Sequence, residues 1–282
     1  MYKRIALAIA FSPRMEALIQ EAMRMVDLHG ASLILIHVGD DTEEKKANLH
    51  DMLDKWQINK NKVKIIWKSG RPDKKILQAC NQENVDLLIA GALKQENMFT
   101  YYIGSIARKI IRKAKCSVLI LIEPDTKPRN FDKVVINGTQ REDTPDIIKK
   151  GIDFCKTEHS SQVYIVNEIK MYLLRMATAS EESEEKAAAI KRQLVKDEVS
   201  YVENILKPID QGDLKVSIKV TGGRWAVELA KFSEKIKADL LIVGGHQNLT
   251  FFDRIFPHDL EDMLSNLPCN LLIINNPVHE RT

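Results

Sequence analysis

Two glycines frame a stretch of the chain where backbone groups could bind an anion. Gly91 ends an apolar run, and Gly104 and Ser105 open a stretch with a helical pattern. A glycine lets the backbone approach a bound group closely, and the first N–H groups of a helix have no partner within it and point toward an anion. The spacing therefore fits a phosphate-binding loop, and it fits an ordinary helix start equally well.

Charge favours an anion at this helix start. Residues 104–115 contain several lysines and arginines and no acidic residue. For the segment 112–115 we favour a solvated face whose cations complement the carboxyl end of the helix. Lys94 lies between the two glycines, where it either adds a positive charge to the site or blocks it.

The other side chains that could do chemistry form no recognisable catalytic or metal-binding pattern. The seven histidines include no HExxH, the four cysteines include no CxxC pair, and no GxxxxGK[ST] loop occurs. Such patterns are typical of zinc sites and of P-loop enzymes. We therefore predict no catalytic residue and no metal site, and we expect the cysteines to be reduced and buried, as in a cytoplasmic protein.

Composition excludes several classes of partner. The 282 residues are 44% hydrophobic and 29% charged, and 42 basic against 39 acidic side chains leave a net charge of +3. So small an excess gives no general attraction to nucleic acid or anionic lipid. The longest apolar runs, at 5–11 and 87–93, fall short of the roughly 18 residues of a membrane span. We predict a cytoplasmic protein that binds neither nucleic acid nor membrane.

The chain contains an internal repeat. ENVDLLIAG at 83–91 recurs as IKADLLIVG at 236–244, and two further segments recur at the same offset. Segments near the start of each copy recur at a shorter offset, so the second copy must contain an insertion. The insertion falls within 171–207, where good helix formers predict a long helix. The polar, proline-containing stretch 124–130 is the predicted linker.

Each copy alternates short apolar runs with helical patterns. Continuous apolar strands indicate burial on both faces, which is typical of a parallel sheet covered by helices. We predict an α/β protein with two tandem, doubly wound, five-stranded parallel sheets, in a first domain at 1–124 and a second at 131–278. Ligands of such sheets bind beyond the carboxyl ends of the strands, here after the first and fourth strands. In the first domain the predicted strands are 3–10, 32–38, 62–67, 86–91 and 117–122, and the predicted helices are 13–29, 42–57, 72–83 and 105–114.

The order of these pieces resembles the universal stress protein family, and specifically its tandem two-domain members. Nucleotide-binding members carry G-x-x-G, nine residues and then G-[ST]; Gly91, Gly104 and Ser105 keep this spacing, and Lys94 replaces the second glycine. The resemblance covers essentially the whole chain. It implies a Rossmann-like strand order 3-2-1-4-5 and an internal pseudo-dimer in which the domains pair through their last strands, here 117–122 and 270–275. It also implies ATP binding in some members and no nucleotide in others.

The first domain keeps part of the site that the resemblance implies. Members that hold adenosine usually have an aspartate, often followed by Phe-Ser, at the end of the first strand, where this chain has Ala10, Phe11 and Ser12. An aspartate there can accept hydrogen bonds from the nucleoside, and alanine cannot. The candidate ligand is ATP or AMP, and the candidate binding residues of the first domain are Ala10, Ser12, Val38, Gly91, Lys94, Gly104, Ser105 and Ile106.

The second domain departs further from the motif. Gln247 stands where the motif has its second glycine, and Pro257-His258 replaces Gly-Ser. Proline has no N–H to offer a phosphate. The first helical turn then holds carboxylates, which satisfy the helix dipole and repel an anion. We predict no cofactor in the second domain, on the strength of Pro257 and of the carboxylates Asp259, Glu261 and Asp262.

The sequence predicts a non-catalytic stress-response protein whose output is ligand occupancy or the docking of a partner protein. One alternative is a weak ATPase that uses the first-domain loop, and another is a scaffold that binds no nucleotide. The missing aspartate and the missing second glycine favour the scaffold. The sequence leaves open whether two chains associate as a homodimer.

Overall fold

The computed structural model describes residues 2–58, 62–94, 101–169, 184–245 and 264–275. It divides into two compact units. Unit 1 comprises Met1–Arg129 with Gly245–Leu249 and Asn270–Thr282, and unit 2 comprises Asn130–Gly244 and Thr250–Cys269. The domain boundaries at 124 and 131 remain predictions.

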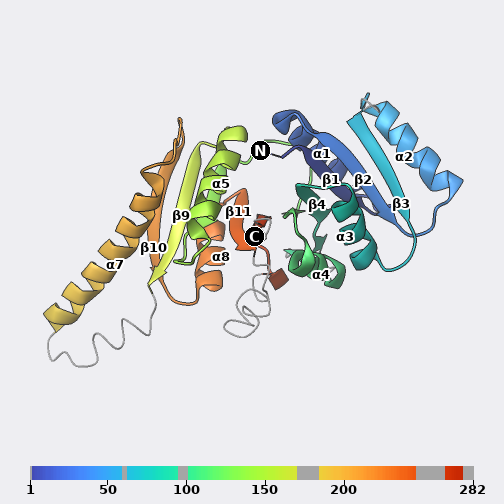
Figure 1. Cartoon of the computed structure of the whole chain (residues 1–282). Helices are drawn as coiled ribbons and strands as arrows, with labels where there is room; N and C mark the ends of the chain where they lie inside the picture. The colour runs from blue at the N-terminus through green and yellow to red at the C-terminus, as the bar shows by residue number, and fades with distance from the viewer. Residues whose placement is uncertain (1, 59–61, 95–100, 170–183, 246–263, 276–282) are drawn as a thin grey trace, which may run out of the picture. The chain divides into compact units, whose positions relative to one another are not determined.

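Unit 1 contains a parallel sheet whose strands alternate with helices along the chain (Figure 1). The hydrogen-bonded order is β3-β2-β1-β4-β7, with β12 beyond β7, which confirms the predicted order 3-2-1-4-5. The strands are β1 (Arg4–Ile9), β2 (Ser32–Val38), β3 (Val63–Lys68), β4 (Leu87–Gly91), β7 (Ser117–Leu121) and β12 (Asn270–Asn275). The helices are α1 (Met15–His29), α2 (Glu43–Lys55), α3 (Pro72–Gln82) and α4 (Ser105–Lys113).

The apolar runs form the core of unit 1 because helices cover both faces of the sheet. Strands β1, β2, β4 and β7 are buried over most of their length. Helices α3 and α4 pack against each other (Figure 1), and right-handed crossovers place α1 and α2 on the opposite face. Helix α1 ends at Gly30, whose φ of 61° is left-handed and suits a residue without a Cβ.

The last strand of the second repeat, β12, belongs to unit 1. It pairs antiparallel with β7, with Leu271 opposite Ile120. The side-chain amide of Asn275 donates to the carbonyls of Ala114 at 3.0 Å and Cys116 at 2.8 Å. This confirms the predicted pairing of 117–122 with 270–275, and β7 therefore has strands on both sides.

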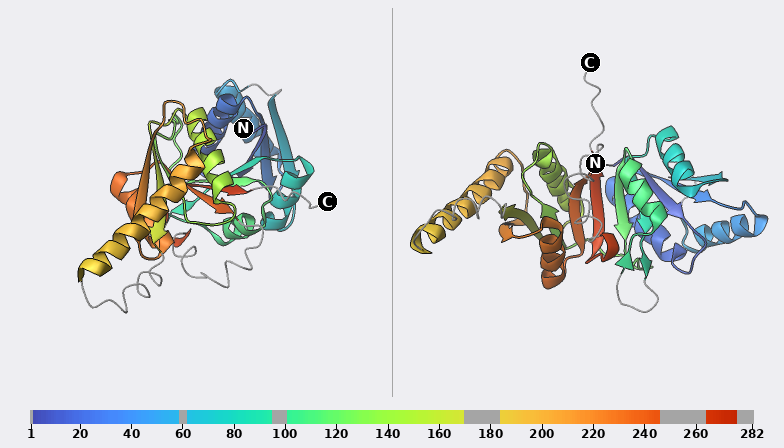
Figure 2. Two further views of the ribbon diagram at one scale, coloured as in Figure 1. Left: turned by 60° about the vertical axis from the view of Figure 1, so that its left-hand side comes forward. Right: turned by 90° about the horizontal axis from the view of Figure 1, so that it is seen from below.

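Unit 2 repeats the strand–helix alternation with a longer helix. Its described parallel strands follow the order β10-β9-β8-β11. Helix α7 contacts β9 and β10 (Figures 1 and 2) and has 23 residues, against 13 in α2, which confirms the predicted long helix. The elements are β8 (Lys133–Asn137), α5 (Thr144–Thr157), β9 (Gln162–Ile169), α7 (Glu184–Leu206), β10 (Lys215–Gly222), α8 (Trp225–Ile236) and β11 (Leu240–Gly245).

Each unit fixes the start of its first strand with one aspartate. In unit 1, Asp86 Oδ2 accepts hydrogen bonds from two successive amides at 2.8 and 2.9 Å, those of Lys3 and Arg4. In unit 2, Asp239 Oδ2 accepts from two successive amides at 3.0 and 2.8 Å, those of Asp132 and Lys133. The two units therefore share this hydrogen-bonding pattern as well as their sequence repeat.

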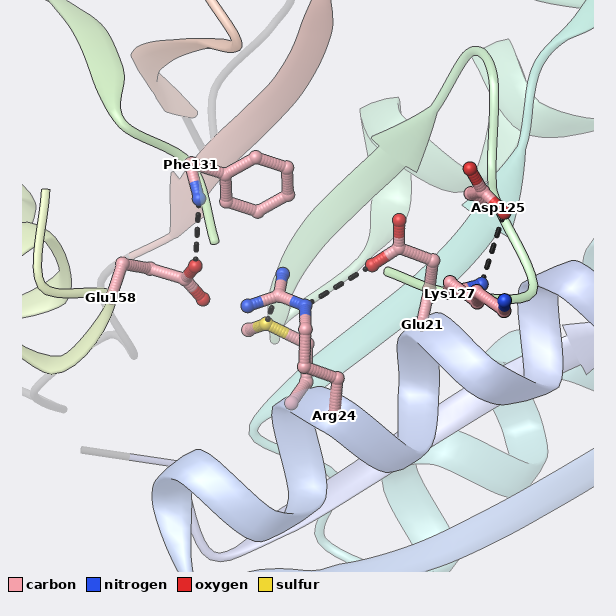
Figure 3. Close-up of polar contacts among 7 residues, drawn as sticks. Glu21, Arg24, Asp125, Lys127, Phe131 and Glu158 are labelled. Atoms are coloured by element: carbon pink, nitrogen blue, oxygen red, sulfur yellow. Dashed lines mark hydrogen bonds and ion pairs between the residues drawn. The ribbon is translucent and has the colours of Figure 1, made fainter. Parts of the chain in front are cut away.

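Side-chain hydrogen bonds to backbone amides also order the chain around the junction of the repeats (Figure 3). In unit 1, Asp125 Oδ1 accepts from the amide of Lys127 at 3.0 Å. In unit 2, the fully buried Glu158 accepts from the amide of Phe131 at 3.0 Å through Oε2. The latter contact gives a buried backbone donor a side-chain oxygen as its acceptor just before β8.

None of the helices in the described part of the chain is long and apolar enough to cross a membrane.

Candidate functional site

The sheet of unit 1 brings several of the predicted site residues to one edge. Strand β1 is hydrogen-bonded to β2 on one side and to β4 on the other. The chain leaves these strands at Ile9, Val38 and Gly91, so their carboxyl ends lie together. Ala10 and Ser12 are exposed directly after β1, whereas Val38 is only partly exposed.

Gly91 lies where neighbouring side chains leave little room. A Cβ added at this position would lie 3.2 Å from Leu18 Cδ1 and 3.9 Å from an Nη of Arg14. Both neighbours come from α1 or the residue before it. The glycine therefore allows close packing of α1 over the end of β4.

Gly104, Ser105 and Ile106 form the start of α4, as the sequence predicted. Gly104 is the N-cap residue with extended backbone angles, and the first hydrogen bond within the helix runs from Arg108 N to Gly104 O at 3.0 Å. The earlier amides therefore have no partner within the helix. Ser105 and Ile106 are exposed, and the first turn of α4 has no acidic residue.

The loop before α4 contains a short ribbon that the sequence did not predict. Strand β5 (Leu93–Lys94) pairs antiparallel with β6 (Tyr101–Tyr102), so Lys94 lies opposite Tyr101. Leu93 is half exposed, and its Cδ1 would be 2.7 Å from a Cβ added to Gly104. The ribbon thus holds Gly91 and Gly104 at the two ends of one loop.

Aromatic side chains lie beside Ala10 and Val38. The ring of His37 is 5.0 Å from that of Phe11 and 5.1 Å from that of Trp67, both edge-to-face. His37 is buried, and its Nδ1 lies 3.2 Å from the carbonyl oxygen of Ile9, so this nitrogen is the donor. This part of the edge is packed by rings, and Ala10 offers no side-chain acceptor.

Arg14 is a residue of this edge that the sequence analysis did not single out. Its guanidinium donates to the carbonyl of Ala92 at 2.9 Å and to the carbonyl of Ile122 at 2.8 Å. It also lies 5.8 Å from the ring centroid of Tyr101. The Tyr101 hydroxyl donates to Glu123, and burial together with this carboxylate raises the pKa of Tyr101 to about 12. A basic residue at a helix start after the first strand was the only available signal.

The equivalent edge of unit 2 has different chemistry. Ser32 N donates to Lys3 O, and Ser161 N donates to Asp132 O, both at 3.0 Å. These bonds and the aspartate contacts described above pair Lys3 with Asp132 and Ser32 with Ser161 in the two units. Counting along the chain from these pairs, Thr139 corresponds to Ala10 and Asn167 to Val38.

Helix α7 contributes a carboxylate to that edge of unit 2. The side-chain amide of Asn167 donates to Glu198 Oε2 at 3.0 Å, and that of Gln140 donates to the same oxygen at 3.2 Å. Thr139 donates to Asn137 Oδ1 at 3.1 Å through its amide and at 2.7 Å through its hydroxyl. The polar side chains at this edge of unit 2 therefore bond to one another in two sets, one around Glu198 and one between Thr139 and Asn137.

The predicted second-domain residues at 247, 257–259, 261 and 262 lie outside the described residues. Within the described part of the chain, no group of three or more histidine, cysteine, aspartate or glutamate side chains is placed to hold a metal ion.

Comparison with known protein families supports the internal repeat found in the sequence. The sequence profile of the universal stress protein family matches residues 39–121 and again 134–275. The chain belongs to the universal stress protein family. The two matches make it a tandem two-domain member, as the resemblance in sequence implied.

Individual relatives match either one repeat or the whole of this universal stress protein. Universal stress protein MJ0577 of Methanocaldococcus jannaschii is 25% identical in an alignment of 154 positions that covers 43% of this chain and 95% of the relative. The solved structure of PA1789, a functionally unknown protein from Pseudomonas aeruginosa PAO1, has a TM-score of 0.74 at 12% identity and covers 98% of this chain and 93% of its own. A putative universal stress protein from Pseudomonas aeruginosa UCBPP-PA14 has a TM-score of 0.70 at 13% identity, covering 97% and 93%. These two structures support the fold alone.

Proposed function

We propose that this universal stress protein is a non-catalytic, cytoplasmic binding protein that takes an adenine nucleotide or another phosphate-containing ligand in unit 1 only. The observation that carries the proposal is the start of α4. Ser105 and Ile106 are exposed there, the first turn lacks an acidic residue, and Gly91 and Gly104 bound the same loop. Amides without partners at a helix start favour a phosphate.

The chemistry of unit 2 supports restriction of the ligand to unit 1. Glu198 places a carboxylate beside Asn167 of β9 and Gln140, which follows β8, and it already accepts a hydrogen bond from each of them. A phosphate at this edge of unit 2 would meet that negative charge and would have to displace those bonds. We therefore expect no more than one ligand per chain.

The nucleoside part of such a ligand would have few polar partners in unit 1. Ala10 has no side-chain acceptor, and the neighbouring side chains Phe11, His37 and Trp67 are in contact with one another. Affinity would then come mainly from the phosphate end. Occupancy would act by shifting the population of conformations that bind a partner protein, without turnover.

Calorimetry with ATP, AMP and cyclic AMP on the intact protein and two variants tests the proposal. Gly104 has a φ of −65°, so other residues can adopt its backbone conformation, although an added Cβ requires the half-exposed side chain of Leu93 to move in both variants. Gly104→Asp adds an acceptor and a negative charge where the amides are free, and we expect it to weaken binding about tenfold or more. Gly104→Ala adds the same Cβ without the carboxylate and should stay within about threefold of the wild type.

The outcomes separate the alternatives. A wild-type protein that releases no heat with any of the three nucleotides contradicts nucleotide binding and favours the scaffold. Two ligands per chain would contradict restriction to unit 1. Steady release of phosphate from ATP that is lost in Ser105→Ala would replace the non-catalytic proposal with a weak ATPase.

A further inference from the structure

Arg14 places a positive charge at the amino end of α1, where the helix dipole disfavours cations. It is the N-cap residue of α1 and makes no capping hydrogen bond through its side chain. The amino end of a helix carries a partial positive charge, so a cation there costs roughly 0.3–1 kcal/mol. The acidic residue of the first turn, Glu16, is bonded to Lys55 and Trp56 at 2.7 Å each. Helix capping therefore does not explain Arg14.

The charge of Arg14 also has no carboxylate partner among the described residues. Its two hydrogen bonds go to the neutral carbonyls of Ala92 and Ile122, and the partly buried guanidinium lies 5.8 Å from the ring centroid of Tyr101. The nearby carboxylate of Glu123 accepts from the Tyr101 hydroxyl. Burial of a charge without a counter-ion costs free energy, and an anionic ligand that pairs with the guanidinium would offset this cost.

The guanidinium of Arg14 lies next to the loop that leads from β4 to α4. Ala92 directly follows Gly91, and Tyr101 lies just before Gly104, so Arg14 contacts both ends of the loop. Ile122 follows β7, the strand that α4 leads into. The guanidinium therefore fixes three chain segments at the carboxyl edge while the remaining donors have no partner among the described residues.

We propose that Arg14 is the charged ligand-recognition residue of unit 1, which both positions the loop after β4 and pairs with the phosphate of the bound anion. This proposal rests on the proposed function, because it assigns the residue that supplies the positive charge of that site. The ligand class is an anion with phosphate groups, for which a planar guanidinium is suited.

Binding of pyrophosphate and ATP to three variants tests the charge directly. Arg14→Met keeps a long side chain and removes the charge, and we expect it to weaken binding of both ligands about tenfold or more. Arg14→Lys keeps the charge but cannot bridge both carbonyls, so its affinity should lie between that of the wild type and that of Arg14→Met. Lys3→Met is the matched control, because Lys3 is an exposed cation of unit 1 at the opposite, amino edge of β1, and it should change affinity less than about twofold.

The ionic-strength dependence distinguishes ligand contact from a purely structural role. Loss of a ligand-binding charge should flatten the dependence of affinity on salt in Arg14→Met, while Arg14→Lys should retain the wild-type slope. A loop that was merely loosened would lose affinity with the slope unchanged in Arg14→Met, and that result would overturn the assignment. Wild-type affinity in Arg14→Met would overturn it too and would leave the proposed function standing.

A second measurement on the unaltered protein holds even where Arg14→Met fails to fold. The Nε–H signal of Arg14, identified by its absence in the spectrum of Arg14→Lys, should move on addition of pyrophosphate. A stationary signal in a protein that binds pyrophosphate contradicts the assignment. A wild-type protein that binds neither pyrophosphate nor ATP overturns both this assignment and the proposed function.

Discussion

Removal of the aspartate that holds the start of β1 should destabilise unit 1 by about 2 kcal/mol. Asp86 Oδ2 accepts from the amides of Lys3 and Arg4 at 2.8 and 2.9 Å. A hydrogen bond to a charged group contributes about 1.5–3 kcal/mol when it is well shielded, but Asp86 is exposed, so about 1 kcal/mol per bond is appropriate. Asp86→Ala removes both bonds, and Asp86→Asn keeps an acceptor oxygen without the charge, so it should cost about half as much.

Hydrogen exchange followed by mass spectrometry measures this loss within each unit. Peptides from β1 and β4 of Asp86→Ala should lose about 2 kcal/mol of protection relative to the wild type. Asp239→Ala makes the equivalent change in unit 2, and its loss should appear in peptides from β8 and β11. A loss below about 0.5 kcal/mol in Asp86→Ala, or an equal loss in Asp86→Asn, would refute the assigned role of these bonds.

Three further predictions follow from buried or partly buried polar groups. Burial lowers the pKa of His29 from 6.5 to about 4. Because the unfolded chain takes up this proton at a higher pH than the folded chain, the free energy of unfolding should fall by on the order of 2 kcal/mol, after allowance for solvent, as pH drops from about 6.5 to 4. Denaturation at a series of pH values should show a weaker pH dependence of this free energy for His29→Gln. Asn275→Ala leaves two backbone carbonyls without the donor that each has now, so urea denaturation should show a loss of about 2–4 kcal/mol, and an unchanged midpoint would contradict this. Glu198→Ala frees the amides of Asn167 and Gln140, so backbone exchange after β8 should accelerate, whereas Glu203→Ala, an exposed change on the same helix, should leave it unaltered.

The alternation of apolar runs was sufficient to predict the strands of unit 1, and the resemblance to the universal stress protein family supplied their order in the sheet. The predicted strands at 32–38 and 86–91 differ from the observed Ser32–Val38 and Leu87–Gly91 by at most one residue. These strands are buried on both faces, so their sequence must be continuously apolar and their limits are clear. The helix start at Ser105 was equally clear because glycine and serine precede a strong apolar stripe.

The contacts of long polar side chains could not be predicted in the same way. Arg14 crosses from the start of α1 to carbonyls at positions 92 and 122, and no local pattern encodes a contact over that separation. Glu198 reaches Asn167 only because α7 packs on β9. The ribbon of β5 and β6 has two residues in each strand, too few for a periodic signal.

Titration of the isotope-labelled protein with ATP, followed through its backbone amide signals, tests the central claim most directly. The account predicts that the amides of Ser105 and Ile106 move in a saturable way, together with that of Gly91, while those of Thr139 and Asn167 in unit 2 stay in place. Saturable shifts confined to unit 2, or none in either unit at millimolar ATP, would contradict it.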